Sequence, residues 1–251
     1  KKLMLKSLNY RKSQGAIKLN TSRCILKKNN NNIYLKKLDE SVSHIIVTEA
    51  MILMGYVTSL FLIENNLSAP FRTQKNNFKP HEILEKYRDS EIKEIILKQY
   101  MGRSYISTKP SRHESLGLTS YVQCTSPLRR YLDLVVQRQV YNKVNNFKNI
   151  DAIILKDVIE VSKSKQLEIN NIYKNDKLKF LILFFKSENK ESYRIIFVKW
   201  INHKRNIALV YFPEYSLEIL ITLFVSIEIY SNKIYKVKYI KNDGNLLEFI
   251  Y

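Results

Sequence analysis

The sequence predicts an α+β fold in which a largely helical part precedes a small OB-type β-barrel. Two patterns, one helical and one strand-like, support this fold class. Apolar residues recur at helical spacing in several stretches, namely 42–63, 80–98, 127–146 and 151–180. After a polar, charged linker at 186–192, the pattern changes to short strand-like runs, which are 194–201, 206–212, 217–229, 233–240 and 246–251. Such strands with polar turns suit an OB barrel that binds single-stranded nucleic acid, although any small antiparallel barrel acting as a structural cap would show the same pattern.

The first part of the chain also contains expected strands and loops. Residues 15–38 alternate apolar and polar side chains around the asparagine run 29–32, which predicts two strands joined by a turn. An irregular stretch is expected at 71–80, and the helical pattern of 80–98 is interrupted near its middle. Residues 102–120 are expected to form a loop.

The composition favours a polyanionic partner. The 251 residues carry a formal net charge of +19, with 42 Lys and Arg against 23 Asp and Glu. Such a charge attracts RNA or an anionic membrane surface, and it does not distinguish between them. The two cysteines and four histidines are dispersed without metal-ligand spacing, which argues against a zinc site.

The run from Ile45 to Ile63 is long and apolar enough to cross a bilayer, with Glu49 as its only charge. A helix that is apolar on all sides because it is buried in a large domain has the same pattern. We favour burial, because Glu49 and several small polar residues interrupt the run. Membrane association through this helix is the alternative.

A short segment around Ser126 carries the clearest chemical signal. Ser126 is a preferred N-cap, and Pro127 would then occupy the first helical position, so a helix is expected to begin here. Its first turn would carry Arg129 and Arg130, although the positive end of the helix dipole favours anions. Two guanidinium groups beside free backbone N–H groups describe a phosphate site. Alternatively, the arginines simply pair with Asp133 on the same helix face.

The residues around this segment resemble a known family. The string TSPLRRYLDLVV at 125–136, preceded by His113, Leu116–Leu118 and Tyr121, resembles the signature of the ribonuclease II/R family, the RNB-type 3′→5′ exoribonucleases. Three further stretches are similar to parts of the same domain: Ser13–Ile17 to a strand, Val47–Gly55 to a helix, and Ala69–Gln74 to a segment of the cyanobacterial and plastid branch. By this resemblance, residues 1–186 are the C-terminal part of an RNB-type catalytic domain, and residues 190–251 are an OB-fold-like RNA-binding barrel.

The resemblance implies 3′→5′ hydrolysis of single-stranded RNA with release of nucleoside 5′-monophosphates. Arg129 would contact the scissile phosphate as charge develops on it, with Arg130 as a second catalytic candidate. The residues expected to bind RNA are Glu49, Arg72, Tyr121, Ser126 and Tyr131. Glu49 would sense the ribose 2′-OH, unless it pairs with a nearby lysine or arginine.

Several of these residues have ordinary structural alternatives. Arg72 could equally be structural, and a buried Tyr121 or Tyr131 would be a core residue instead of a base-stacking one. His113 matches a histidine of the family, but a direct catalytic role is not expected for it.

The metal ligands of the family are missing from this sequence. The resemblance implies Mg²⁺ held by clustered aspartates upstream of Ser13, whereas no two aspartates of this chain are neighbours. We therefore interpret the chain as a fragment or one half of a split enzyme, completed by an upstream segment or a second chain. A non-catalytic protein that binds single-stranded RNA is the alternative. The bias towards Lys, Asn and Ile suggests an AT-rich genome, so a plastid or cytoplasmic location without a membrane is expected.

Overall fold

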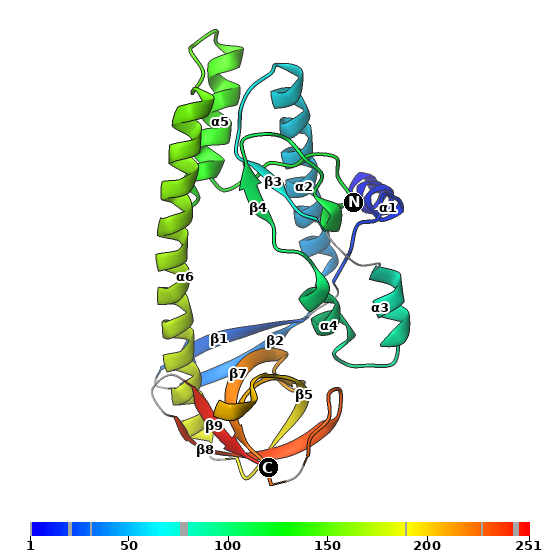
Figure 1. Ribbon diagram of the computed structural model, residues 1–251, viewed down its shortest axis with the longest axis vertical. Helices are drawn as coiled ribbons and strands as arrows, with labels where there is room; N and C mark the ends of the chain where they lie inside the picture. The colour runs from blue at the N-terminus through cyan, green and yellow to red at the C-terminus, as the bar shows by residue number, and fades with distance from the viewer. Residues whose placement is uncertain are drawn as a thin grey trace. The chain divides into compact units, whose positions relative to one another are not determined.

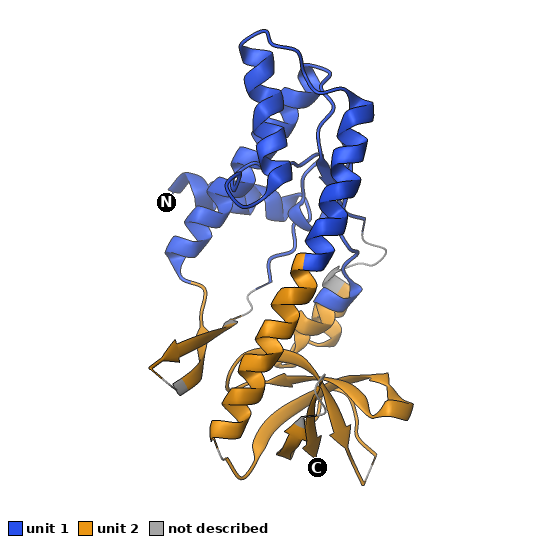
Figure 2. Cartoon of the chain, turned by 90° about the vertical axis from the view of Figure 1, so that its left-hand side faces the viewer, with its two compact units in different colours: residues 1–19, 41–80, 98–168 blue, residues 20–40, 81–97, 169–251 orange. Residues whose placement is uncertain are grey.

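The computed structural model of the chain describes residues 2–19, 22–30, 32–75, 80–188, 190–226, 228–242 and 246–251 (Figure 1). Contacts divide the chain into two compact units, coloured separately in Figure 2: residues 1–19, 41–80 and 98–168 form unit 1, and residues 20–40, 81–97 and 169–251 form unit 2. The predicted division at residues 186–190 follows chain order instead. By contacts, three earlier segments belong with the barrel, because their apolar side chains pack on it.

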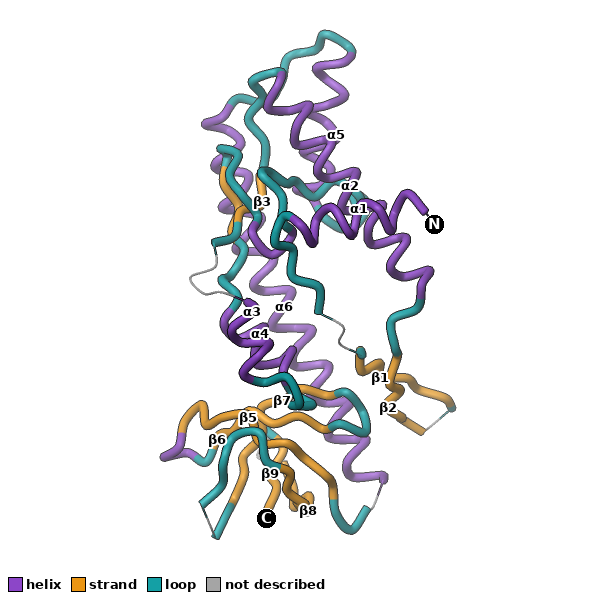
Figure 3. Tube along the Cα trace, turned by 90° about the vertical axis from the view of Figure 1, so that its right-hand side faces the viewer, coloured by secondary structure: helices purple, strands orange, loops and turns teal. Residues whose placement is uncertain are grey.

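Unit 1 is built from helices and two short strands. It contains α1 (Lys2–Ser13), α2 (Val42–Glu64), α5 (Tyr131–Val144) and the first part of α6 (Ala152–Glu188). The strands β3 (Phe71–Thr73) and β4 (Tyr105–Ser107) pair antiparallel. A long segment that is mostly loop and includes the 3-10 turn η1 (Glu114–Leu116) leads from β4 to α5 (Figure 3). One core cluster joins α2, β3, this loop and α5 through Leu62, Ala69, Phe71, Val122, Cys124 and Val136.

The start of the chain differs from the expected strand. The sequence pattern does not predict α1, and the strand expected from the resemblance at Ser13–Ile17 is wrong. Gly15 adopts φ 88°, and the Ala16 N–H donates to the Arg11 carbonyl at 2.8 Å, which ends the helix. The expected pair of strands at residues 15–38 is confirmed only from residue 23 onward.

Helix α2 is long and apolar enough to span a membrane, judged by its length and composition alone. Among the described residues, the predicted burial of α2 is met on one face only. Val47, Met54 and Val57 are each more than half exposed. The buried residues of α2 are small or polar apart from one leucine: Glu49, Gly55, Thr58, Ser59 and Leu62. Small residues are buried because α2 approaches the loop before α5 closely, and this leaves many of its apolar residues on an uncovered face.

Unit 2 begins with a hairpin and two short helices. β1 (Arg23–Asn29) and β2 (Asn32–Leu38) pair antiparallel, and α3 (Pro80–Lys86) and α4 (Lys93–Tyr100) confirm the predicted helical stretch and its interruption. The hairpin packs on the barrel core through Cys24, Leu26, Ile33 and Leu35. Residues from α4 and the turn before it pack on strand β5 of the barrel, and the residues that meet are Ile92, Ile95, Ile96, Ile196 and Val198.

The remainder of unit 2 is a closed five-stranded barrel, which confirms the predicted one. Its strands are β5 (Tyr193–Asn202), β6 (Ile207–Phe212), β7 (Leu217–Phe224), β8 (Ile234–Asn242) and β9 (Leu247–Ile250). They close in the order β5-β6-β7-β9-β8. Neighbouring strands are antiparallel except for β7 and β9, which are parallel. This arrangement is that of an OB-type barrel.

Aromatic side chains fill the barrel core, and α6 supplies the central one. α6 continues to Glu188, beyond its predicted end at residue 180, so part of the predicted linker is helical. The extra turns bring Phe185, which is 1% exposed, into the core. Its ring centroid lies 5.0 Å from that of Tyr193 and 5.3 Å from that of Phe249. The barrel and the end of α6 therefore share one core.

Replacing Phe185 should strongly destabilise the barrel unit. Phe185→Ala removes a buried ring and leaves a cavity, so we expect a loss of about 3–5 kcal/mol in the free energy of unfolding. Urea unfolding followed by the fluorescence of Trp200, the single tryptophan of the sequence, measures it. Phe180→Ala on the same helix is the matched control, because Phe180 is 41% exposed. A similar loss for both variants would contradict the shared core.

Candidate nucleic-acid interface

The loop that leads into α5 is held against α2 at close range. The Arg72 N–H donates to the Tyr121 carbonyl at 2.8 Å, and the Val122 N–H reaches the Gly55 carbonyl at 3.4 Å. A Cβ atom at Gly55 would lie 2.3 Å from the Val122 carbonyl oxygen and 2.5 Å from a ring carbon of Tyr121. Only glycine fits at this crossing, and it allows β3, Tyr121 and the start of α5 to lie beside one another.

The turn before α5 differs from the predicted helix start. α5 begins at Tyr131 with Arg130 as its N-cap, so the expectations of Ser126 as N-cap and Pro127 as the first helical residue are wrong. The Arg130 N–H donates to the Ser126 carbonyl at 3.0 Å, which closes a separate turn. Arg130 is extended, with φ −130° and ψ 107°, and this interrupts the helical path. Asp133, in the first turn of α5, fixes this geometry because its carboxylate binds both the Ser126 N–H before the interruption and the Arg130 side chain at it.

Asp133 is the centre of this arrangement. Its Oδ2 accepts the Ser126 N–H at 2.9 Å and the Nε of Arg130 at 3.0 Å, and Nη2 of Arg130 lies 2.8 Å away. The side chain is 2% exposed, so the carboxylate is a buried charge that depends on these donors. For Arg130, the structure thus shows the alternative in which the arginine pairs with Asp133.

Arg129 is placed differently from Arg130. It is exposed, and its Nη2 reaches the Ser126 hydroxyl at 3.4 Å, a long contact that leaves most of its donors directed to solvent. A guanidinium group can bind a phosphate through two parallel hydrogen bonds. Of the two predicted catalytic arginines, Arg129 is therefore the one available to a ligand.

Arg72 adds a further positive charge to the site. It projects from β3 and is half-buried. Burial, followed by the charge of Arg130, lowers the pKa of Arg72, whereas Tyr121 and Asp133 act in the opposite direction. Arg72 and Arg130 thus share the single negative charge of Asp133. An anion bound here would relieve their repulsion.

His113 lies beside Arg72 but is buried and neutral. Its ring meets the ring of Tyr121 edge-on at 5.9 Å. Burial, and then the charge of Arg72, lowers the pKa of His113 to about 4. Nδ1 of His113, Oε1 of Gln74 and Oγ1 of Thr73 are buried without a hydrogen-bond partner among the described residues. A histidine that is uncharged at neutral pH in this position is unsuited to a role as general acid.

The two tyrosines of the site differ in exposure. Tyr121 is 9% exposed and packs at Gly55, and burial raises the pKa of its hydroxyl. It therefore forms a wall of the site and cannot present its ring face to a base. Tyr131, in the first turn of α5, is 59% exposed, so its ring face is accessible to a base. RNA binding by either residue stays a prediction.

Glu49 belongs to a separate, buried ion pair. Arg11 of α1 donates to both oxygens of the Glu49 carboxylate, through Nε at 3.1 Å and through Nη2. Nη1 of Arg11 donates to the Leu116 carbonyl at 2.9 Å. Gly117 follows with φ 66°, and a Cβ there would lie 2.6 Å from the Arg11 carbonyl oxygen. The structure thus shows that Glu49 pairs with an arginine, which was the structural alternative to sensing the ribose. Contact of Glu49 with a ribose stays a prediction.

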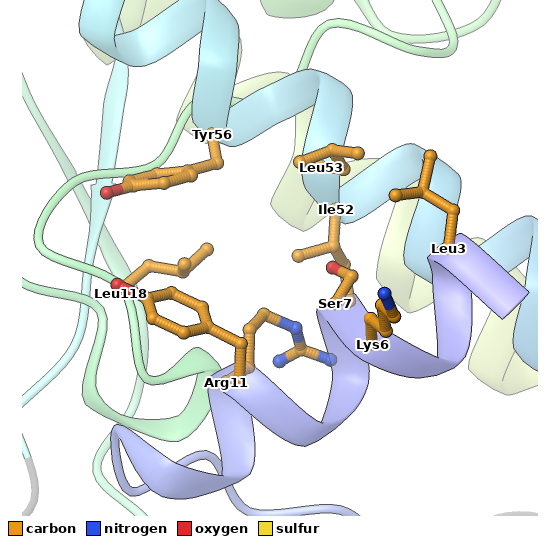
Figure 4. A pocket seen from close by; sticks show the side chains of 9 residues that line it. Leu3, Lys6, Ser7, Arg11, Ile52, Leu53, Tyr56 and Leu118 are labelled. Atoms are coloured by element: carbon orange, nitrogen blue, oxygen red, sulfur yellow. The ribbon is translucent and has the colours of Figure 1, made fainter.

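A cavity of about 320 Å³ lies between α1 and α2, beside this ion pair (Figure 4). Its walls include Leu3, Ile52, Leu53, Tyr56 and Leu118. Lys6, Ser7, Tyr10 and Arg11 complete the lining. The Arg11 guanidinium is already bound to Glu49 and to the Leu116 carbonyl, so the cavity has no counterpart of the exposed Arg129.

The described residues do not form a magnesium site. Among them, no three His, Cys, Asp or Glu side chains come together as ligands would. Mg²⁺ in proteins is held largely by carboxylates and water. The buried carboxylates of unit 1, Glu49 and Asp133, are each bound to an arginine. The residues present therefore do not fit the metal that the family resemblance implies.

The barrel carries a second group of basic and aromatic residues. The 3-10 turn η2 (His203–Arg205) connects β5 to β6, and the His203 ring lies 4.9 Å from the ring of Trp200. Lys204 and Arg205 follow in the same turn. OB barrels bind oligonucleotides through this loop and the next two strands. The loop between β8 and β9 includes residues 243–245, which lie outside the described residues. RNA binding by the barrel stays a prediction.

Comparison with known proteins identifies the family. The model of the RNB domain matches residues 2–146, more than half of the chain, so the chain belongs to the RNB-domain family, as predicted. The chain is 30% identical over 220 residues to an uncharacterized ribonuclease of Synechocystis, which covers 85% of this chain and 33% of that protein. It is 28% identical over 139 residues to the chloroplastic and mitochondrial ribonuclease II of Arabidopsis thaliana, which covers 52% of this chain and 17% of that protein. The chain thus spans about a third or less of these relatives.

Solved structures share the fold. An active-site mutant of the Dss1 exoribonuclease of Candida glabrata matches with a TM-score of 0.82 at 18% identity, over 99% of this chain and 34% of that one. The Mycoplasma genitalium RNase R in complex with ribose-methylated single-stranded RNA matches with a TM-score of 0.80 at 16% identity, over 99% of this chain and 48% of that one. Yeast Ssd1, a pseudonuclease, matches with a TM-score of 0.55 at 16% identity, over 87% and 30%. The same fold therefore occurs in exoribonucleases and in a pseudonuclease.

The structure brings together most of the predicted site residues of unit 1. Arg72, Tyr121, Ser126 and Arg130 meet around Asp133, with Arg129 and Tyr131 on the adjoining exposed turn. Glu49 is not part of this group. Sequence reasoning missed Arg11, because no local signal indicates it: the Arg11–Glu49 contact joins residues that are 38 positions apart. Thr73 and Gln74 lie in a segment that resembles the family, but their side chains were not predicted to belong to the site.

Protonation of His113 should make the fold less stable in mild acid. His113 titrates near 6.5 when unfolded and near 4 when folded, so stability is lost as the pH falls through this window. From about pH 7.5 to about pH 5 we expect a loss of about 2 kcal/mol from this residue. Urea unfolding at both pH values measures it. The variant His113→Gln should lose this part of the pH dependence of stability. The control His203→Gln, at an exposed position, should retain it. An unchanged pH dependence in His113→Gln would contradict the assignment of His113 as buried and neutral.

Proposed function

We propose that this chain is the RNA-contacting part of a hydrolytic 3′→5′ exoribonuclease that acts on single-stranded RNA and releases nucleoside 5′-monophosphates. The observation that carries the proposal is the exposed guanidinium of Arg129 beside Arg130 and Arg72, where Asp133 balances only one positive charge. Membership of the RNB-domain family, whose relatives are named ribonucleases, supports it.

The three arginines would have different roles in binding a phosphate. Asp133 fixes Arg130 and the turn that follows Ser126, so Arg129 is presented from a rigid support. Arg129 would bind the scissile phosphate and stabilise the charge that builds on it. Arg72, which lies near Arg130 and Asp133, would add to the positive potential at the bound phosphate. The neutral His113 neither takes nor gives a proton in this scheme, because its pKa lies near 4.

We propose that the Mg²⁺ of the family is held by carboxylates outside this chain, on an upstream segment or on a second chain. In a complete enzyme the metal would activate the attacking water. Two observations favour an additional polypeptide: the chain spans about a third of its Synechocystis relative, and α2 leaves Val47, Met54 and Val57 exposed. A covering polypeptide would bury these side chains.

A non-catalytic protein that binds single-stranded RNA is the second candidate. The observation that favours it is the absence of carboxylate clusters among the described residues, together with the fold shared with a pseudonuclease. For the location we propose a plastid, with the cytoplasm as the alternative. The chloroplastic and mitochondrial ribonuclease II of Arabidopsis thaliana supports an organelle.

Incubation of the chain alone with 5′-labelled oligo(A) RNA and Mg²⁺ tests the division of roles. We expect no shortening of the RNA, but we expect binding that weakens steeply with salt, because arginines and lysines displace counterions from phosphates. Gel analysis and fluorescence anisotropy measure the two quantities. A ladder of shortened products would show that the metal ligands are in this chain, and salt-insensitive or absent binding would contradict the RNA-contacting role.

Arg129→Ala separates catalysis from binding in the protein completed by its metal-binding segment. We expect kcat to fall about 10²–10³-fold with a much smaller change in RNA affinity, because Arg129 would act on charge that develops in the transition state. Single-turnover kinetics and anisotropy measure both. Lys75→Ala, which removes a charge from the exposed segment after β3, is the matched control. Equal losses of turnover and affinity in Arg129→Ala would count against the assigned role.

A further inference from the structure

We propose that single-stranded RNA also binds along the outer face of α5, a surface formed by Tyr131, Leu134, Arg138, Tyr141 and Phe147. The inference rests on the proposed function, since it assigns a path to RNA whose phosphate is bound at Arg129.

The outer face of α5 is a continuous exposed strip of the helix. Positions 131, 134, 138 and 141 recur at three- and four-residue spacing, so they lie on one side of the helix. Tyr131 and Tyr141 are each 59% exposed, and Leu134 is 46% exposed. The buried residues of α5 lie on its other side: Asp133, Val135, Val136 and Gln139. The outer face therefore takes no part in the core of unit 1.

Two aromatic rings are held together at the far end of this face. The ring centroids of Tyr141 and Phe147 lie 6.0 Å apart with their planes tilted by 43°. Phe147 is 58% exposed, yet its backbone is fixed, because its N–H donates to the Asn142 carbonyl at 2.7 Å after the left-handed Asn146. Exposed rings in fixed positions are the groups on which unpaired bases stack.

The charge of the segment matches a phosphate chain. Arg129, Arg138, Lys143 and Lys148 are exposed. The only acidic residue between 128 and 148 is Asp133, which is buried and bound to Arg130. The accessible charge of the segment is thus positive throughout. This complementarity favours a polyanion as the occupant over an apolar protein surface.

The spacing of rings and cations suits a strand that runs along the helix. Ten residues separate Tyr131 from Tyr141, which is about 15 Å along an α-helix at a rise of about 1.5 Å per residue. Arg138 lies between the two rings. Alternation of stacking rings with cations is how proteins bind single-stranded nucleic acid without reading its sequence. The outer face begins at the turn that carries Arg129, so both can contact one RNA strand.

Binding of oligo(A) RNA of about 4 and about 16 nucleotides, the usual range of site sizes, tests the proposal on the chain 1–251. The double variant Tyr141→Ala/Phe147→Ala should weaken binding of the longer RNA about tenfold and leave the shorter RNA within about twofold. Arg138→Gln should reduce the slope of log affinity against log salt by about 1 for the longer RNA. Anisotropy measures affinities, and circular dichroism verifies that each variant is folded.

The matched control is Tyr173→Ala/Lys174→Gln, which removes an exposed ring and cation from α6. It should change neither affinity by more than about twofold. Equal losses in the control and in the α5 variant would show that the RNA binds without preference for α5, and would overturn the outer face as a site. Unchanged binding of the longer RNA by the α5 variant would overturn it as well, while leaving the proposed function intact. Failure of the wild-type chain to bind either RNA would instead overturn the proposed function.

Discussion

The candidate site depends on the buried carboxylate of Asp133. It accepts the Ser126 N–H and binds the guanidinium of Arg130, so it joins the turn to the helix that follows. A carboxylate in the first turn of α5 is also favoured by the positive end of the helix dipole. Without it, the charge of Arg130 and a backbone donor would be left with little compensation beside Arg72. The conformation of the turn that presents Arg129 depends on this acceptor, whereas the close approach of β3 and Tyr121 depends on Gly55.

A second buried ion pair, Arg11–Glu49, fixes the first helix of the chain in the same way that Asp133 fixes the turn before α5. α1 buries only Leu8 and Arg11, too little apolar surface to fix a helix by itself. The Arg11 guanidinium compensates by binding Glu49 and the Leu116 carbonyl together. Because removing either partner would leave an isolated buried charge, the pair specifies how α1 meets α2. A side chain that serves this purpose is poorly placed to read a ribose.

The parts of the fold that were predictable are those with strong periodicity. The barrel strands, α2 and the pair α3 and α4 have patterns long enough to identify, whereas α1 has no apolar stripe and escapes detection. The Ser126-Pro127 pair is a good local helix start, yet Asp133 shifts the start to Tyr131 by binding across the turn. The N-cap preference of Ser126 is overridden there by a contact between residues seven positions apart. The cluster of Arg72, Tyr121 and Arg130 was predictable only through family resemblance, because residues so far apart in sequence carry no shared pattern.

The parallel pairing of β7 with β9 has a consequence for synthesis of the chain. β9 occupies residues 247–250 and completes the ring by pairing with β7 on one side and β8 on the other. Until those residues leave the ribosome, β7 and β8 present open edges while the rings around Phe185 stay accessible to water. The nascent protein thus passes through a stage with unpaired strands, which are prone to join other chains. For this unit, the barrel closes only after β9 has been synthesised, so its strand edges need protection until then.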